Sequence, residues 1–192
     1  GFLKLDFLYA ACIEPRHDKT RGQVMADAMD FLREISNGAL LLGCGVPLGS
    51  AFGKVDYCRI GCDVSLDWDD KSYMKMMHRE RISTKNSILN SVFRRQLNGR
   101  AFYNDPDVYI LRDTGTELTD AQKQCLAEIN AMNGGVLFTS DNMNSYDEIT
   151  QKIFSRIMAL RNSKVISAEL IDKHLIVKFT IGERKFIRKY KM

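Results

Sequence analysis

Short apolar runs alternate with amphipathic segments along the first 160 residues of the chain. The apolar runs are 1–11, 39–42, 55–60, 108–111 and 136–139. Between them, apolar side chains recur at the spacing of one helix face, which predicts helices over 20–35, 83–97, 119–132 and 146–160. Strands this apolar are typical of a parallel sheet covered on both faces, so the pattern predicts an α/β fold.

Local signals mark where these helices begin and which side they bury. Ser83 is a suitable N-cap, and Thr119 with Gln122 is a capping-box pair. Helical spacing predicts which side chains are buried: Leu89, Val92, Phe93 and Leu97 in the second helix, and Ile149, Ile153, Ile157 and Leu160 in the last.

The pattern changes near residue 161, where apolar and charged residues begin to alternate. Breaks near 172–173 and 182–183 divide the tail into three short strands, as expected of an antiparallel β-module. We therefore predict an α/β part at 1–160 and the start of a second domain at 161–192. The tail holds nine Lys or Arg against three Asp or Glu. Their alternation with apolar residues favours a solvated sheet face over a nucleic-acid-binding patch.

Composition narrows the class of protein. With 192 residues and 45% hydrophobic content, the chain can bury one sizeable core. No apolar stretch approaches the roughly 18 residues that cross a bilayer, so we expect no membrane partner. Five cysteines without scaffold spacing favour a reducing, cytoplasmic location. His17, His78 and His174 lack metal-ligand spacing, so no metal site is expected. Because the sequence opens inside a predicted strand without Met, we expect a piece of a longer protein.

The first candidate for chemistry is a charged pair in the first apolar run. Lys4 and Asp6 are two residues apart, so in a strand they share one face. A cation beside a carboxylate keeps it ionised at neutral pH, as a nucleophile or charge stabiliser in acyl or glycosyl transfer requires. A structural ion pair at a strand end is an equally good interpretation of the pair alone.

Further polar residues follow the predicted strands, namely Asp6, Cys44, Asp63, residues 104–107 and Asp141. The carboxyl ends of parallel strands meet on one face, so we expect these groups to converge on one cavity. Asp6 and Asp63 come from separate strands and suit a reaction that uses two acids in different protonation states, most commonly glycoside hydrolysis. A turn role is favoured for Asp105 and Asp107 around Pro106. Trp68 lies in a polar loop and suits either of two roles, stacking on the face of a sugar or anchoring the loop by packing.

Four motifs resemble melibiase-type α-galactosidases, glycoside hydrolase family 36, in the order of that family. The motifs are Lys4-Leu5-Asp6-Phe7-Leu8-Tyr9, the run 42–49, Arg59-Ile60-Gly61-Cys62-Asp63-Val64, and 104–107 followed by 111–113. The resemblance implies a partial (β/α)8 TIM barrel, strands four to eight, followed by the start of an antiparallel β-sandwich domain. It also implies hydrolysis of terminal α-galactosides such as melibiose and raffinose, with retention and without a cofactor.

The same resemblance implies a role for each matching residue. Asp6 would be the nucleophile and Asp63 the acid/base, while Lys4, Cys44 and Arg59 would bind the sugar. In a retaining enzyme the two carboxyl groups lie about 5 to 5.5 Å apart, and the acid/base has the higher pKa.

Several alternatives stay open at this stage. An α-N-acetylgalactosaminidase and an α-galactosyl transglycosylase are close in chemistry, and a catalytically inactive barrel fragment belongs to a different class. A phosphate-binding barrel enzyme is disfavoured, because Gly134-Gly135 precedes a strand and not a helix. We expect the 192-residue chain alone to be inactive, and a homo-oligomer of the longer protein stays open.

Overall fold

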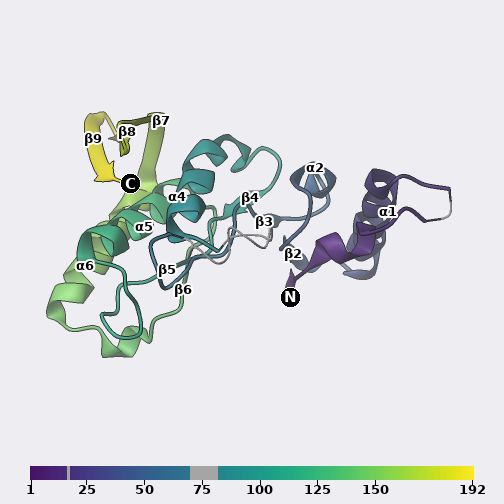
Figure 1. The fold of residues 1–192 in the computed structure, drawn as a ribbon, viewed down its shortest axis with the longest axis horizontal. Coiled ribbons are helices and arrows are strands. Elements are labelled where there is room, and N and C mark those ends of the chain that lie inside the picture. The colour runs from purple at the N-terminus through teal and green to yellow at the C-terminus, as the bar shows by residue number, and fades with distance from the viewer. Residues whose placement is uncertain (17, 70–81) are drawn as a thin grey trace.

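The computed structural model describes residues 1–16, 18–69 and 82–192. Figure 1 shows an elongated molecule in which the first helix and the C-terminal strands lie at opposite ends. The strands are β1 (Phe2–Leu5), β2 (Leu40–Gly43), β3 (Tyr57–Arg59), β4 (Tyr103–Asp105), β5 (Val108–Tyr109), β6 (Phe138–Thr139), β7 (Ser163–Ile171), β8 (His174–Ile181) and β9 (Arg184–Lys191). The α-helices are α1 (Arg21–Ile35), α2 (Leu48–Ala51), α4 (Thr84–Phe93), α5 (Asp120–Asn133) and α6 (Glu148–Ala159). Short 3-10 helices are η1 (Leu8–Cys12), η2 (Arg95–Leu97), η3 (Met143–Ser145) and η4 (Leu160–Asn162).

The predicted parallel sheet is present in two pieces. Strands β1, β2, β3 and β4 pair in chain order and all run parallel, while β5 and β6 form a second parallel pair. Sequential parallel strands with helices between them bring the loops after β1, β2 and β3 to one edge. This edge is where the polar motifs lie.

The sequence predicted one buried strand for the first apolar run, and this prediction is wrong. β1 ends at Leu5, and the chain turns through Phe7, whose φ of 53° is left-handed, into η1. The N–H groups of Leu8 and Tyr9 then donate to the carbonyls of Cys44 and Gly45 beyond β2. β1 is also largely exposed, because β2 is its only partner among the described strands.

Strand β4 was not predicted from the sequence. Asn, Asp and Pro at 104–107 are turn-forming residues, so this stretch was predicted as a loop. The structure buries Asn104 and Asp105 completely and pairs β4 with β3, with Asp105 opposite Arg59. Tertiary contacts with Arg59 override the local turn preference.

Helix starts were predicted well, and their buried faces only in part. Ser83 caps α4 by accepting from the Asn86 N–H, and Thr119 with Gln122 forms the capping box of α5. In α4, Val92 is buried as predicted, but Phe93 is 51% exposed. The helix instead buries the face with three hydroxyl side chains and two aliphatic ones, which allows close packing: Thr84, Ser87, Ile88, Ser91 and Val92.

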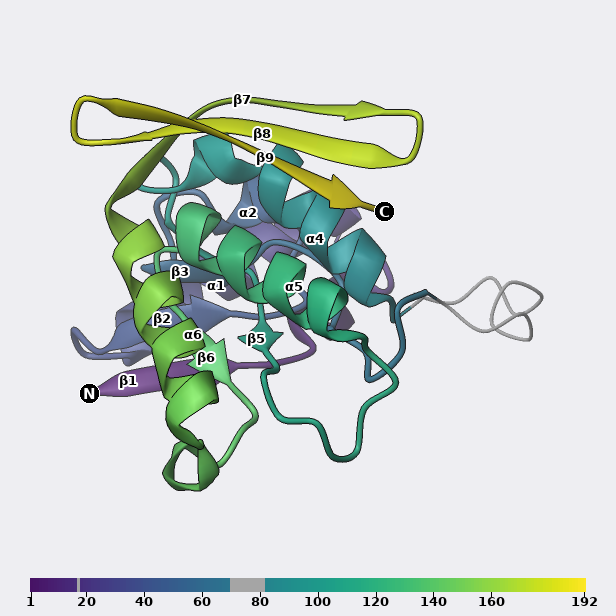
Figure 2. The same cartoon turned by 90° about the vertical axis from the view of Figure 1, so that its left-hand side faces the viewer.

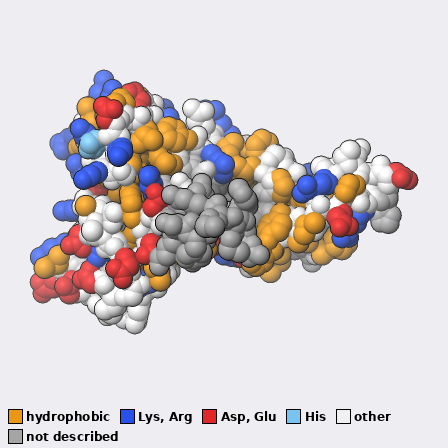
Figure 3. Space-filling view, in the orientation of Figure 1, with side chains coloured by type: hydrophobic (Ala, Val, Ile, Leu, Met, Phe, Trp, Pro, Cys, Tyr) orange, Lys and Arg blue, Asp and Glu red, His pale blue; other side chains and the backbone are white. Residues whose placement is uncertain are grey.

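The tail forms the predicted antiparallel sheet of β7, β8 and β9. Its turns contain Asp172, Lys173 and Gly182, all with positive φ. Figure 2 shows this sheet lying along α4 and α5, and the buried residues of β8 join one core cluster with those of α5. In Figure 3, Lys and Arg side chains gather at this end of the molecule. This core cluster contains residues from both sides of residue 160, so the domain boundary predicted there stays a prediction. Among the described residues, no helix is long and apolar enough to cross a membrane.

Two isoleucines of α6 provide a test of this packing. Both were predicted to be buried, but Ile157 is 2% exposed and Ile149, in the first turn, is 68% exposed. Replacing Ile157 with Ala should lower the free energy of unfolding by about 2 to 5 kcal/mol, because it leaves a cavity. Ile149→Ala is the matched control and should change it by no more than about 0.5 kcal/mol. Urea unfolding followed by circular dichroism measures both, and equal losses would contradict this packing.

Candidate active site

A cavity of about 730 Å³ opens at the carboxyl ends of β1, β2 and β3. Four of the five residues predicted to form the site line it: Asp6, Cys44, Arg59 and Asp63. The fifth, Lys4, lies on β1 and is not among the described residues that line the cavity. Its positive charge nevertheless acts on Asp6, two residues further along the chain. The structure thus brings together groups that are up to 57 residues apart in the chain.

Asp6 stands just beyond the end of β1. Its Oδ1 atom accepts the N–H of Phe7 at 2.8 Å, and the thiol of Cys44 also hydrogen-bonds to it. Burial is the largest single influence and raises the pKa of Asp6, but these hydrogen bonds and the charges of Lys4 and Arg59 together lower it overall. Asp6 is therefore an ionised, oriented carboxylate facing the cavity.

Cys44 has the opposite electrostatic character. Burial is the largest cause that raises the pKa of its thiol, to about 12, and the neighbouring Asp6 carboxylate adds to the effect. A thiol in this state stays protonated at neutral pH and can donate a hydrogen bond. Cys44 thus acts on Asp6 as a donor and is not a nucleophile.

Arg59 is the centre of the charge network beside the cavity. Its side chain is only 6% exposed, and each of its three nitrogens contacts a different carboxylate at 2.8 Å. Nε contacts Asp105, Nη2 contacts Asp107 and Nη1 contacts Asp63. Burial alone would lower the pKa of Arg59, but Asp105 and Asp107 raise it well above its ordinary value.

The three carboxylates differ in their surroundings. Asp105 and Asp107 are buried, and burial raises the pKa of Asp107 despite the nearby guanidinium. The side chain of Asp63 is 63% exposed and lines the cavity. Of the three carboxylates, Asp63 is therefore the one that can reach a molecule bound in the cavity. The predicted separation of the Asp6 and Asp63 carboxyl groups stays a prediction.

Not all polar strand ends converge on this cavity. Asp105 and Asp107 support Arg59, which agrees with the structural role favoured for them, although the partner was not foreseen. The predicted convergence is wrong for Asp141. Its carboxylate is 1% exposed and accepts from Tyr146 Oη and from the main chain and side chain of Arg112. It joins two loops away from the cavity.

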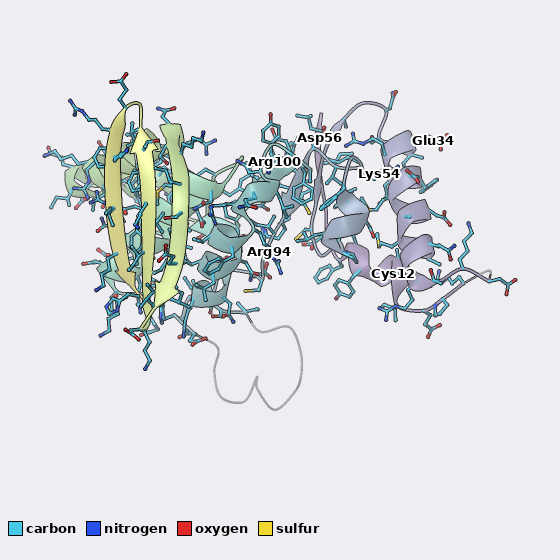
Figure 4. All side chains as sticks on the ribbon, turned by 90° about the horizontal axis from the view of Figure 1, so that it is seen from above. Cys12, Glu34, Lys54, Asp56, Arg94 and Arg100 are labelled. Carbon is cyan, nitrogen blue, oxygen red and sulfur yellow. The ribbon has the colours of Figure 1, made fainter. Side chains whose placement is uncertain are left out.

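Sequence reasoning also missed one wall of the cavity, which belongs to α4. Asn86, Asn90 and Arg94 line it at four-residue spacing, and Arg94, labelled in Figure 4, donates to the carbonyl of Ile60 at the end of β3. The repeat of these polar side chains at the helical period was the available signal in the sequence.

Two further sequence predictions concern residues outside the cavity. Trp68 is half-buried against the core that contains α5, which supports the packing role. His17 and His78 lie outside the described residues. Within the described part of the chain, no group of three or more His, Cys, Asp or Glu side chains could hold a metal ion.

Comparison with known proteins gives the following picture. No family model matches the chain. Among solved structures, the chain is similar to TtGalA, an α-galactosidase from Thermus thermophilus, in complex with p-nitrophenyl α-D-galactopyranoside. The identity is 25% and the TM-score is 0.72, over 95% of this chain and 36% of that one. The same enzyme in complex with stachyose matches with 27% identity and a TM-score of 0.68, over 83% of this chain and 33% of that one.

A more distant neighbour is a GH27 β-L-arabinopyranosidase from Geobacillus stearothermophilus. It matches with 13% identity and a TM-score of 0.64, over 99% of this chain and 45% of its own length. These likenesses confirm the predicted fold, a partial (β/α)8 barrel followed by the start of a C-terminal β domain, of the kind found in α-galactosidases. The chain spans about a third of the Thermus enzyme. Membership of glycoside hydrolase family 36 in particular stays a prediction.

The buried and the exposed carboxylate partners of Arg59 should contribute differently to the free energy of unfolding. Asp105→Ala leaves a buried guanidinium short of a counter-charge and should lower the free energy of unfolding by about 3 to 5 kcal/mol. Asp63→Ala removes an equally short but exposed contact and should cost at most about 1 kcal/mol. Urea unfolding of the two variants checks this, and a large loss for Asp63→Ala would make Asp63 a structural residue.

Proposed function

We propose that this chain forms the catalytic part of a glycoside hydrolase that releases terminal α-D-galactose from α-galactosides such as melibiose and raffinose, with retention of configuration. The observation that carries the proposal is the oriented carboxylate of Asp6, in the same cavity as a second, exposed carboxylate on another strand. The likeness to an α-galactosidase complexed with an α-galactoside supports it.

In the proposed mechanism, Asp6 attacks the anomeric carbon and forms a covalent galactosyl ester. The N–H of Phe7 and the thiol of Cys44 hold its carboxylate, so little reorganisation precedes attack. Asp63 first donates a proton to the leaving oxygen and then takes one from the water that cleaves the ester. Because Asp63 reaches the cavity from the Arg59 network, the leaving group would lie on that side.

We include in this proposal the sugar-binding roles that the family resemblance implies for Lys4, Cys44 and Arg59. Cys44 and Arg59 line the cavity, whereas Lys4 acts on Asp6 through its charge. The substrate would be a small carbohydrate, bound without a metal or organic cofactor. Buried thiols at Cys12, Cys44, Cys58 and Cys125 suit the cytoplasmic location that we propose.

We further propose that activity needs more of the barrel than these 192 residues. The chain corresponds to about a third of the Thermus enzyme, and β1 has one pairing edge open among the described strands. Enzyme assays should therefore use the protein as it occurs naturally.

Azide rescue tests both acid assignments in that protein. Asp6→Gly should reduce the hydrolysis of p-nitrophenyl α-galactoside by at least about a thousandfold, because no covalent intermediate can form. Azide should then restore turnover and give β-galactosyl azide by a single displacement. Nuclear magnetic resonance identifies the anomer.

Asp63→Gly is the matched control variant. It still forms the galactosyl ester, so azide attack on that ester should give α-galactosyl azide. If Asp6→Gly gives the α-azide and Asp63→Gly the β-azide, the two roles are reversed. An unsubstituted protein that does not hydrolyse α-galactosides would refute the proposed function.

The lowered pKa of Asp6 leads to a prediction about pH. Carbon-13 labelling of its carboxyl group should give a titration midpoint below the ordinary value of 3.8. Lys4→Met removes a positive charge that favours the carboxylate, so the midpoint should rise. Lys19→Met, which removes a lysine paired with Asp27 on the exterior, is the control and should leave it unchanged. A midpoint that does not move in Lys4→Met would show that Lys4 does not act on Asp6.

A further inference from the structure

A closed ring of contacts holds the segment that carries Asp63. The two oxygens of Asp107 have different partners: Oδ1 contacts Arg59 Nη2, and Oδ2 accepts the N–H of Val64, the residue after Asp63, at 2.7 Å. Arg59 in turn contacts Asp63 through Nη1. Asp63 is thus held from both directions, through its own carboxylate and through the main chain next to it.

The members of this ring have little freedom. Asp107 has a φ of 74°, a left-handed conformation that Asp tolerates better than most residues, and its N–H donates to Asp105 Oδ1 at 2.9 Å. The other oxygen of Asp105 contacts Arg59 Nε. Two buried carboxylates thereby occupy two of the three guanidinium nitrogens, and Nη1 remains for Asp63.

We infer that Asp107, supported by Asp105, is a positioning residue that sets the place of Asp63 through Arg59 and through the Val64 N–H. This inference rests on the acid/base role proposed for Asp63. Asp107 is buried beside the cavity and is not among its lining residues, so it acts on the reaction only through its partners. The fixed ring keeps the exposed carboxylate where a leaving oxygen would need it, since small displacements of an acid cost large factors in rate.

Asp107→Asn opens the ring at one link with little other change. Asn has nearly the same volume and tolerates a left-handed backbone, but its single carbonyl oxygen can serve Arg59 or Val64 and not both. The naturally occurring protein is assayed with two substrates. Melibiose has a poor leaving group, glucose, that needs protonation by an acid, whereas the nitrophenolate of p-nitrophenyl α-galactoside leaves with little protonation. We expect kcat/KM for melibiose to fall at least about tenfold more than for the nitrophenyl substrate.

Asp141→Asn is the matched control. Asp141 is also a buried Asp whose oxygens link an arginine, Arg112 at 2.8 Å, to backbone N–H groups, but it lies away from the cavity. Any loss of folded protein in this variant lowers the apparent kcat/KM for both substrates by the same factor and leaves the ratio of the two values unchanged. Titration of active sites with an activated fluorosugar corrects both variants for folded fraction.

The outcomes separate this inference from the proposed function. If the unsubstituted protein cleaves both substrates and Asp107→Asn lowers kcat/KM for both by the same factor, Asp107 is merely structural and the inference is wrong. If the ratio changes in Asp107→Asn and not in Asp141→Asn, the inference holds. If the unsubstituted protein cleaves neither substrate, the proposed function itself fails.

Discussion

A buried guanidinium is the constraint on which much of this structure depends. Taking the Arg59 charge out of water costs several kcal/mol unless carboxylates replace the lost hydration. Asp105, at the end of β4, and Asp107 beyond it supply those charges, and the pairing of β3 with β4 places Asp105 opposite Arg59. The requirement to neutralise one arginine therefore couples strand pairing to the layout of the site.

The same constraint divides the cavity into two parts with different physical character. On one side, Asp6 is held by a backbone N–H and a protonated thiol, in a loop that hydrogen-bonds to the segment after β2. On the other side, Asp63 is exposed and depends on a buried charge network. An oriented nucleophile and an acid held by a buried arginine suit the double displacement that we propose. Both residues are exposed aspartates, so the scaffold supplies their difference through the hydrogen-bond donors and charges beside each one.

The C-terminal sheet is joined to the helices by packing and by polar contacts to Glu128 of α5. Leu175, Val177 and Phe179 of β8 lie in the core that contains α5, and Tyr190 Oη donates to Glu128 at 2.6 Å. Because the hydroxyl of Tyr190 is buried, it needs such an acceptor, and Glu128 also accepts from Gln124 on its own helix. The sheet thus stabilises α5, on the side of the barrel away from α1 (Figures 1 and 4).

The sequence by itself determined the element types, the helix caps and the motifs at the strand ends, because these depend on residues close together in the chain. Thr119 with Gln122 and the breaks at 172–173 and 182–183 are local signals, and the structure follows them. Asp6, Cys44 and Asp63 were found because parallel strands place their carboxyl ends on one edge, whereas Arg59 was found through the family resemblance. Only the tertiary structure decided that 104–107 begins with a strand, that Phe93 faces away from the core, and that Asp141 stays out of the cavity. Each of these depends on partners distant in sequence: the Arg59 charge for Asp105, the close packing on the serine face of α4 for Phe93, and Arg112 with Tyr146 for Asp141. Local pattern carries no information on such partners, since burial and charge pairing are set only when the chain folds back on itself.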